Sequence, residues 1–364
     1  MPTAVISRGS GPVAVLPSSS APLAELALTR ADGSAGTVGA VMDTTDTVGW
    51  AVAHRGSVVA EEYREGMTAD LRHLLFSVSK SLVATVVGAL HGAGEIDLEM
   101  VCASFVPALA NCGYGGATVR NLLDMRSGIA FSENYRDPAA EIHALDQAVG
   151  WAPRIDPGAP ATIRDFLVTL RQKSPHGGPF EYRSCETDVL GWVCEVVGGQ
   201  RMPDLMAELL WGRLGAEKDA TIAVDAAGTG FFDGGISTTL RDMIRFGSLF
   251  VRDGVSLTGR QVVPPAWIAE TLNGGPDSRE AFAASPDDTG MPGGMYRNQV
   301  WFPYPGNDIA VCLGMCGQMI YVNRSAEIIA AKFSAQPISE DPHPLRDTLH
   351  AFDTVARAVG ANIV

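Results

Sequence analysis

The fold is decided around Leu74-Leu75-Phe76-Ser77-Val78-Ser79-Lys80-Ser81-Leu82-Val83-Ala84-Thr85-Val86-Val87-Gly88-Ala89-Leu90, which predicts a turn followed by an apolar helix. Ser77 and Lys80 lie three residues apart at the start of this helix, and residues with that spacing share one helical face. The first turn also carries free N–H groups and the positive end of the helix dipole. We therefore expect a hydroxyl and an amine to meet where that field is strongest.

The position of this pair favours a catalytic role, with the serine as nucleophile and the lysine as its base. The field favours negative charge on the serine oxygen, and it opposes a proton on the amine, as does desolvation by the apolar residues that follow. A lysine with a lowered pKa can take the proton of an adjacent serine and activate it as a nucleophile. We thus expect a neutral amine at Lys80. From the pair alone a second interpretation stays open, in which the lysine reaches solvent beside a serine cap.

The pair is also unique in the chain. Only Lys80 has a serine three positions before it, because the other lysines, Lys173, Lys218 and Lys332, follow Leu170, Gly215 and Ile329 at that spacing. A motif of two residues is weak evidence by itself. A lysine inside an apolar helix needs a reason, however, and this strengthens the functional interpretation.

Composition bounds the class of protein. The chain has 364 residues, 46% of them apolar and 19% charged, which indicates a well-packed globule of one large or two interlocked units. The net charge of −14 argues against nucleic acid and against an anionic membrane surface as partners. Residues 1–22 lack the charged and apolar regions of a secretory signal, and no run of about 18 apolar residues predicts a membrane span.

The cysteines point to a reducing compartment. Six cysteines in a chain of this length do not make a disulfide framework. Cys312 and Cys316 have no further Cys or His partners nearby in the sequence, so they do not indicate zinc. We expect a cytoplasmic protein without a metal or an organic cofactor.

The order of the predicted elements gives the architecture. Residues 1–22 read as an arm, and residues 48–54 and 57–63 as a hairpin joined by Arg55-Gly56. Residues 96–230 are mainly helix and loop. We expect further helices at 162–173, 188–197, 204–214, 240–253, 264–273 and 344–359, and short strands at 299–302, 309–314, 320–322 and 328–333.

Strands at both ends and helices in the middle predict an α/β fold. In this division residues 1–95 and 231–364 form an α/β domain with an antiparallel sheet flanked by helices, and residues 96–230 form a mainly helical insertion domain. The site would lie in the crevice between them.

Several motifs carry a resemblance to a family. Four segments follow one another in the order found in the serine β-lactamase and penicillin-binding-protein superfamily, which the chain resembles: Ser77-Val78-Ser79-Lys80, Leu122-Leu123-Asp124-Met125-Arg126-Ser127-Gly128-Ile129, Tyr182-Arg183-Ser184 and Gly314-Met315-Cys316-Gly317-Gln318. The first segment matches the S-x-x-K signature of that superfamily. Within it the chain is most similar to 6-aminohexanoate-dimer (nylon-oligomer) hydrolases and family VIII carboxylesterases, in residues 72–81, 132–138, 187–192 and 233–237. The resemblance covers roughly residues 45–335 and implies a β-lactamase-like fold.

The resemblance assigns catalytic roles. It implies Ser77 as the acylated nucleophile, Lys80 as its proton acceptor and Tyr182 as a proton shuttle to the leaving group. The N–H of Gln318, which follows Gly317, would hold the oxyanion together with the N–H of Ser77. Taken without the resemblance, Tyr182 reads as a half-buried packing residue.

The sequence departs from the superfamily at one point. Met315-Cys316 stands where the family keeps a basic residue that binds a substrate carboxylate, and this counts against β-lactamase and peptidase activity. We interpret Met315 and Cys316 as strand packing rather than as a site of thiol chemistry.

Substrate contacts are predicted on loops around the crevice. The residues are Tyr135, Asp146, Asp233, Trp301 and Gly317. Tyr135 would bond the scissile amide, Asp146 would meet a substrate ammonium, and Asp233 lies in the Gly-rich turn opposite. The alternatives are a surface tyrosine, solvated or capping carboxylates, and a core tryptophan.

Taken together, these features predict a serine hydrolase that forms an acyl-enzyme on a small amide or ester. A transacylase, or a peptidase or β-lactamase of the same superfamily, is the alternative, and a catalytically inactive binding module is a third. A homodimer stays open as the oligomeric state.

Overall fold

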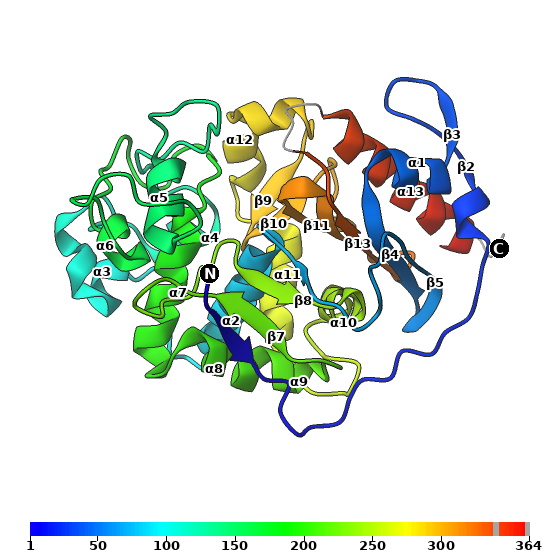
Figure 1. The fold of residues 1–364 in the computed structure, drawn as a ribbon, viewed down its shortest axis with the longest axis horizontal. Helices are drawn as coiled ribbons and strands as arrows, with labels where there is room; N and C mark the ends of the chain where they lie inside the picture. Colours follow the sequence, from blue (N-terminus) through cyan, green and yellow to red (C-terminus); the bar gives the residue numbers. More distant parts are fainter. Residues whose placement is uncertain (338–341, 361–364) are drawn as a thin grey trace.

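The computed structural model describes residues 1–337 and 342–360. It has two regions side by side, a helical region in cyan and green and a large sheet with its covering helices (Figure 1). The expected architecture, an antiparallel sheet flanked by helices with a mainly helical insertion, is confirmed. Among the described residues, no helix combines the length and the apolar character needed to cross a bilayer.

The large sheet is antiparallel and has seven strands. Their spatial order is β5 (Ser57–Tyr63), β4 (Thr47–His54), β13 (Ile328–Ser334), β12 (Gln318–Asn323), β11 (Ile309–Gly314), β10 (Val300–Phe302) and β9 (Met295–Arg297). The predicted hairpin and the predicted meander thus join in one sheet, because β13 pairs with β4. Val, Ile and Ala dominate these strands, as expected for strands buried on both faces.

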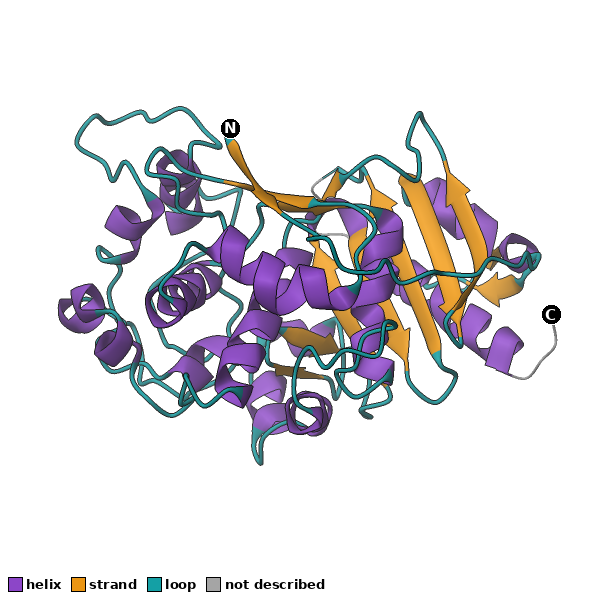
Figure 2. Cartoon of the chain, turned by 90° about the horizontal axis from the view of Figure 1, so that it is seen from below, coloured by secondary structure: helices purple, strands orange, loops and turns teal. Residues whose placement is uncertain are grey.

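Helices cover both faces of this sheet (Figure 2). On one face α10 (Leu240–Val251) packs against β4, β12 and β13. A Cβ at Gly247 would lie 2.5 Å from Ile329, so only glycine allows this close approach. The other face is covered by α1 (Val38–Thr44) and α13 (His343–Gly360), which also pack against each other.

The predicted apolar helix is α2 (Val78–Gly92), and it lies between the two regions. Most of its residues are buried, against β11 and β12 on one side and α7 (Cys185–Gly198) on the other. A helix that is apolar all round is expected to be buried all round. Its N-terminus therefore lies at the junction of the two regions.

The helical region consists of short helices joined by ordered loops. They are α3 (Cys102–Phe105), η2 (Pro107–Asn111), α4 (Val119–Leu123), α5 (Glu141–Val149), α6 (Ile163–Leu167), α7, α8 (Met202–Met206), η3 (Ala207–Trp211) and α9 (Gly212–Leu214). The helix predicted over 162–173 ends at Leu167, because Arg171 and Gln172 pair with the extended chain at Ile129 and Ala130 instead.

A second, four-stranded sheet crosses the division that the sequence predicts. Its order is β1 (Thr3–Ile6), β7 (Ala220–Ala223), β8 (Ile236–Thr238) and β6 (His73–Leu74). The start of the predicted arm is thus a strand, and β7, from the predicted insertion of 96–230, pairs with β8 from the predicted α/β segment. Residues 27–29 and 35–37 form a further small hairpin, β2 (Ala27–Thr29) and β3 (Ala35–Thr37). The remaining elements are η1 (Leu23–Glu25), α11 (Pro265–Asn273), α12 (Ser278–Ala283), η4 (Pro286–Thr289) and η5 (Met315–Gly317).

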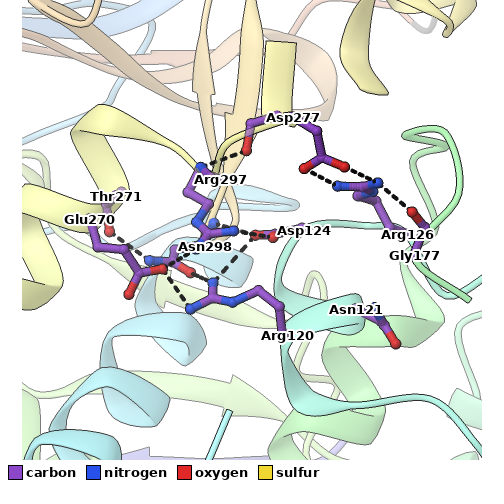
Figure 3. A network of polar contacts seen from close by, with 12 residues as sticks. Arg120, Asn121, Asp124, Arg126, Gly177, Glu270, Thr271, Asp277, Arg297 and Asn298 are labelled. Carbon is purple, nitrogen blue, oxygen red and sulfur yellow. Dashed lines mark hydrogen bonds and ion pairs between the residues drawn. The ribbon is translucent and has the colours of Figure 1, made fainter. Parts of the chain in front are cut away.

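Ion pairs tie the helical region to the large sheet (Figure 3). Arg297, at the end of β9, contacts Asp124 after α4 at 2.5 Å, and it also pairs with Glu270 of α11. Arg120 of α4 reaches Glu270 at 2.5 Å. Arg126 pairs with Asp277 at 2.8 Å, also across the two regions. These contacts fix the junction in which the cavity described below lies.

Candidate active site

A cavity of about 510 Å³ lies over the start of α2, at the junction of the helical region and the large sheet. Its wall is largely apolar and aromatic, with a few polar groups directed into it, which is the usual character of a small-molecule site. The lining residues are Phe76, Ser77, Glu133, Tyr135, Ile142, His143, Asp146, Trp151, Tyr182, Ser184, Phe231, Asp233, Gly234, Trp301, Leu313, Gly314, Met315 and Cys316.

Ser77 and Lys80 meet as the helical spacing predicts. Ser77 is the residue that precedes the first turn of α2, and the Nζ of Lys80 donates a hydrogen bond to its Oγ at 2.8 Å. Lys80 is only 1% exposed, so its amine does not reach solvent. Phe76, just before Ser77, has a φ of +47°, a conformation that L residues rarely adopt. The strained turn directs the serine into the cavity.

The charge of Lys80 differs from the prediction. Burial lowers its pKa, but the negative charges of Tyr182, Asp233 and Glu133 outweigh burial and raise the pKa above the ordinary lysine value. Asp233 contributes twice, since its carbonyl oxygen accepts from Nζ at 2.9 Å and its Oδ2 lies 3.7 Å away. The structure therefore does not support the expectation of a neutral amine, because Tyr182 and the neighbouring carboxylates together reverse the effect of the apolar helix on the pKa of Lys80.

Tyr182 lies against both of these residues. It comes from the extended segment before α7, and the Nζ of Lys80 is 5.0 Å from the centre of its ring. Burial raises the pKa of the phenol, while the charge of Lys80 and hydrogen bonds with Ser77 and Lys80 lower it. Trp301 of β10 stacks on the ring at 5.3 Å. The structure thus brings together Ser77, Lys80 and Tyr182, the three residues predicted to react.

Two acids that the sequence prediction missed lie behind this group. Asp188 of α7 is 1% exposed, and its Oδ1 accepts from the backbone N–H groups of Phe232 and Asp233 at 3.0 and 3.3 Å. Glu133 accepts from the backbone N–H of Ser184. Burial raises the pKa of both carboxyls. Asp188 shares α7 with Glu186 and Glu195, which are also buried, so the helix pattern alone did not single it out.

The predicted substrate contacts divide into two sets. Tyr135, Asp146, Trp301 and Asp233 all line the cavity. Burial, and then the charge of Asp233, raise the pKa of Asp146 to about 6. Asp233 is 3% exposed and faces Lys80, so it belongs to the reacting group as much as to the cavity wall.

The second set, Gly317 and Gln318, does not reach this cavity. Both line a separate cavity on the other side of the turn, and the side chain of Gln318 is bonded to backbone groups behind it. Gly314 is the glycine beside the nucleophile, because a Cβ there would lie 2.3 Å from the carbonyl oxygen of Leu75 and 3.3 Å from the nitrogen of Ser77. The predicted donor at Gln318 is thus misplaced, because the register of β11 on β12 brings Gly314, not Gly317, to Ser77.

Met315 and Cys316 also differ from the prediction. They do not lie in a strand but in the short turn η5, which joins β11 to β12, and both line the cavity. Cys316 has a φ of +59°. No basic side chain takes the place of the family's cation at these positions.

Comparison with known proteins agrees with this geometry. A family model described as beta-lactamase matches residues 35–353. The chain belongs to the beta-lactamase family. Over 302 residues it is 39% identical to a 6-aminohexanoate-dimer hydrolase of Paenarthrobacter ureafaciens, covering 83% of this chain and 76% of the relative. A serine hydrolase of the beta-lactamase family is therefore the class of enzyme to which the chain belongs.

Solved structures share the fold. The structure named "Putative 6-aminohexanoate-dimer hydrolase from Bacillus anthracis" superposes with a TM-score of 0.86 at 25% identity, over 99% of this chain and 91% of that one. A family VIII carboxylesterase superposes with a TM-score of 0.64 at 17% identity, over 87% of this chain and 95% of its own. The second similarity concerns the fold of this beta-lactamase-family chain and not its substrate.

Proposed function

We propose that the chain hydrolyses small linear amides, with esters as a second substrate class, through an acyl-enzyme on Ser77. The observation that carries this proposal is the 2.8 Å contact between Lys80 Nζ and Ser77 Oγ, with Tyr182 against both, at the wall of the cavity. A serine beside a proton-accepting group is the arrangement that nucleophilic catalysis requires.

Lys80 and Tyr182 act as one proton-accepting pair. Because nearby carboxylates favour the ammonium form of Lys80, the reactive form is the pair that has lost one proton, with the ammonium stabilising a tyrosinate. Ser77 attacks the carbonyl carbon, and its proton passes to the oxygen of Tyr182. The same proton is then delivered to the leaving nitrogen or oxygen as the C–N or C–O bond breaks. Water repeats the sequence on the acyl-enzyme and releases the acid.

The oxyanion is held by two backbone N–H groups. We assign the first donor to Ser77, whose N–H makes no hydrogen bond to another residue in the described chain. We assign the second to Met315, which follows Gly314 in the cavity wall and takes the role predicted for Gln318. Removal of one such donor typically lowers the rate about 10²–10³-fold.

The cavity favours a substrate with a terminal amine. Its lining carries three carboxylates, Glu133, Asp146 and Asp233, and its aromatic wall suits an alkyl chain. Among the described residues that line it there is no Lys or Arg, and the buried Lys80 beside it already faces Ser77 and Asp233. A β-lactam or a peptide C-terminus would bring a carboxylate with no lysine or arginine in the described lining to receive it. A linear ω-amino-acid amide also brings an ammonium, which these carboxylates can receive, and the 39% identical relative is named for such a substrate.

The experiment compares Ser77→Ala with the unchanged protein. The unchanged protein should give a burst of p-nitrophenol from p-nitrophenyl acetate, equal to one acyl group per site, and Ser77→Ala should give none. A panel of 6-aminohexanoate dimer, its N-acetyl derivative and nitrocefin should be turned over in falling order. A burst that persists in folded Ser77→Ala would exclude the acyl-enzyme, and added alcohols or amines as acceptors would reveal a transacylase.

We propose the cytoplasm as the compartment. All six cysteines are free thiols, and four of them are buried. Free thiols persist where glutathione and thioredoxin keep the environment reducing.

A further inference from the structure

The turn η5 (Met315–Gly317), which we assign to the oxyanion site, is a strained segment. Cys316 has a φ of +59° and a ψ of 20°, which is the left-handed conformation that residues with a Cβ avoid. Such a conformation persists only where the surroundings fix it. On its front side the segment is held against the nucleophile, because Gly314 leaves no room for a side chain next to Leu75 and Ser77.

Behind the turn, the side chain of Gln318 donates hydrogen bonds to carbonyl groups of the turn. Its Nε2 lies 3.2 Å from the carbonyl oxygen of Met315, 3.3 Å from that of Cys316 and 2.7 Å from that of Ser334 on β13. Its Oε1 accepts from the N–H of Ser334 at 3.1 Å. Gln318 is only 1% exposed, so water does not compete for these bonds. One amide thus links the turn to the centre of the sheet.

Lys332 of β13 supports the last residue of the turn. It is fully buried, and its Nζ bonds Ser334 Oγ and lies 3.4 Å from the carbonyl oxygen of Gly317 and 3.5 Å from that of Thr45. Among the described residues it forms no ion pair, although Asp46 is close enough to favour its charge. The backbone N–H of Gln336 completes the arrangement by donating to the carbonyl oxygen of Cys316 at 3.2 Å. We call Gln318, Lys332, Ser334 and Gln336 the turn cradle.

A buried lysine without a carboxylate partner is costly to a protein and needs a reason. Its three hydrogen-bond partners are oxygen atoms of Thr45, Gly317 and Ser334, and the one from Gly317 belongs to the turn that faces Ser77. The reaction mechanism proposed above does not use this amine. Its position therefore points to a role in holding the turn rather than in proton transfer.

We propose that the turn cradle positions the Met315 N–H for the oxyanion, so that Gln318 and Lys332 are positioning residues for both acylation and deacylation. This inference rests on the proposed function, because it concerns the second donor of the same site. The ground-state carbonyl needs this donor less than the oxyanion does, so loosening the turn should affect the transition state more than substrate binding.

The test uses Gln318→Met and Lys332→Met, which keep the side-chain volume and remove the donors. With p-nitrophenyl acetate, each should lower kcat about tenfold or more with KM within about twofold, since loss of a whole donor costs about 10²–10³-fold. Affinity for a trifluoromethyl ketone, which forms a tetrahedral oxyanion on the serine, should fall by the same factor as kcat. Lys332→Gln, which keeps a donor, should recover part of the loss.

Thr47→Val is the matched control, because Thr47 is a buried polar residue that pairs with Ser334 and has no bond to the turn. It should leave kcat unchanged. Gln318→Met decides the question should Lys332→Met not fold. A folded Gln318→Met with unchanged kcat and ketone affinity would overturn the cradle while the Ser77 burst still stands. A burst that persists in folded Ser77→Ala would instead overturn the proposed function itself.

Discussion

The carboxylate of Asp233 lies 3.7 Å from the Nζ of Lys80, and both groups are almost completely buried. After Tyr182, Asp233 is the largest influence that favours the charged form of this lysine at the start of α2. Burial alone would favour a neutral amine, but an acid at this distance favours the ammonium. The proposed proton acceptor is therefore the Lys80–Tyr182 pair after loss of one proton, and its activity should rise with pH.

Asp233→Asn should move that rise to lower pH. Without the carboxylate the pKa of Lys80 falls, so the pair loses its proton earlier, by about one pH unit or more. The measurement is the pH dependence of kcat/KM for p-nitrophenyl acetate. Asp146→Asn is the control, because Asp146 is not among the charges that shift Lys80. An unchanged profile in Asp233→Asn would show that this carboxylate does not set the charge of the pair.

Tyr182→Phe should remove proton transfer without disturbing the fold. The ring keeps its stacking on Trp301, while the oxygen that bonds Ser77 and Lys80 is lost. We expect kcat to fall about 10²–10⁴-fold. Tyr296→Phe is the matched control, because Tyr296 packs on the same tryptophan at 4.8 Å. If Tyr182→Phe kept the kcat of the Tyr296 control, the shuttle role would be excluded.

Asp146→Asn should weaken binding of substrates that carry a free amine. The KM for 6-aminohexanoate dimer should rise about tenfold, as for a charged hydrogen bond of about 1.5 kcal/mol or more, and the KM for its N-acetyl derivative should not change. The carboxyl has a pKa of about 6, so in the unchanged protein this KM should also rise as pH falls below 6. An equal change in KM for the dimer and for its N-acetyl derivative would show that Asp146 does not bind the substrate ammonium.

The sequence predicted the elements whose signal is local. Short β-type runs split by turns located β11 and β13, and the 74–90 stretch located α2 and its Ser77–Lys80 face. The role of Tyr182 came from a resemblance, and the structure places it at the expected point. What failed depends on contacts between distant segments.

Two failures illustrate this. The charge of Lys80 depends on Asp233, 153 residues further along the chain, and no helical pattern records that contact. In the sequence, either Gly314 or Gly317 could be the glycine that precedes the second oxyanion donor. The pairing of Gly314 with Gln318 decides which of the two faces Ser77. Asp188 and Glu133 were missed for the same reason, since each is recognisable only through the backbone groups that it accepts from.

Arg297→Met should destabilise the junction between the two regions. Arg297 is 11% exposed and Asp124 is 5% exposed, and the substitution leaves Asp124 with Arg120 at 3.5 Å as its remaining cation (Figure 3). We expect a loss of about 2–4 kcal/mol in the free energy of unfolding by urea, because the buried Asp124 loses its nearer cation. Arg55→Met, which breaks an exposed pair with Glu327, should cost less than about 1 kcal/mol. Equal losses in the two variants would contradict a special role for the network.

Lys332→Met should change how stability depends on pH. Burial lowers the pKa of Lys332 from 10.5 to about 7 in the folded protein. Between these two values the unfolded chain binds one proton more than the folded chain, so Lys332 makes stability rise with pH across this window, by up to about 1.4 kcal/mol per pH unit. Below pH 7 the full cost of burying the ammonium is present, and above 10.5 it is absent.

The measurement compares urea unfolding of the unchanged protein and of Lys332→Met at pH 6, 7, 8 and 9. Taking the difference removes the contributions of all other titrating groups that the substitution leaves alone. The free energy of unfolding of the unchanged protein should gain on that of the variant from about pH 7 upward, with a constant difference below it. Parallel curves over the whole range would mean that Lys332 keeps its ordinary pKa in the fold, in which case its amine must reach water or a carboxylate despite its complete burial against Gly317 and Thr45.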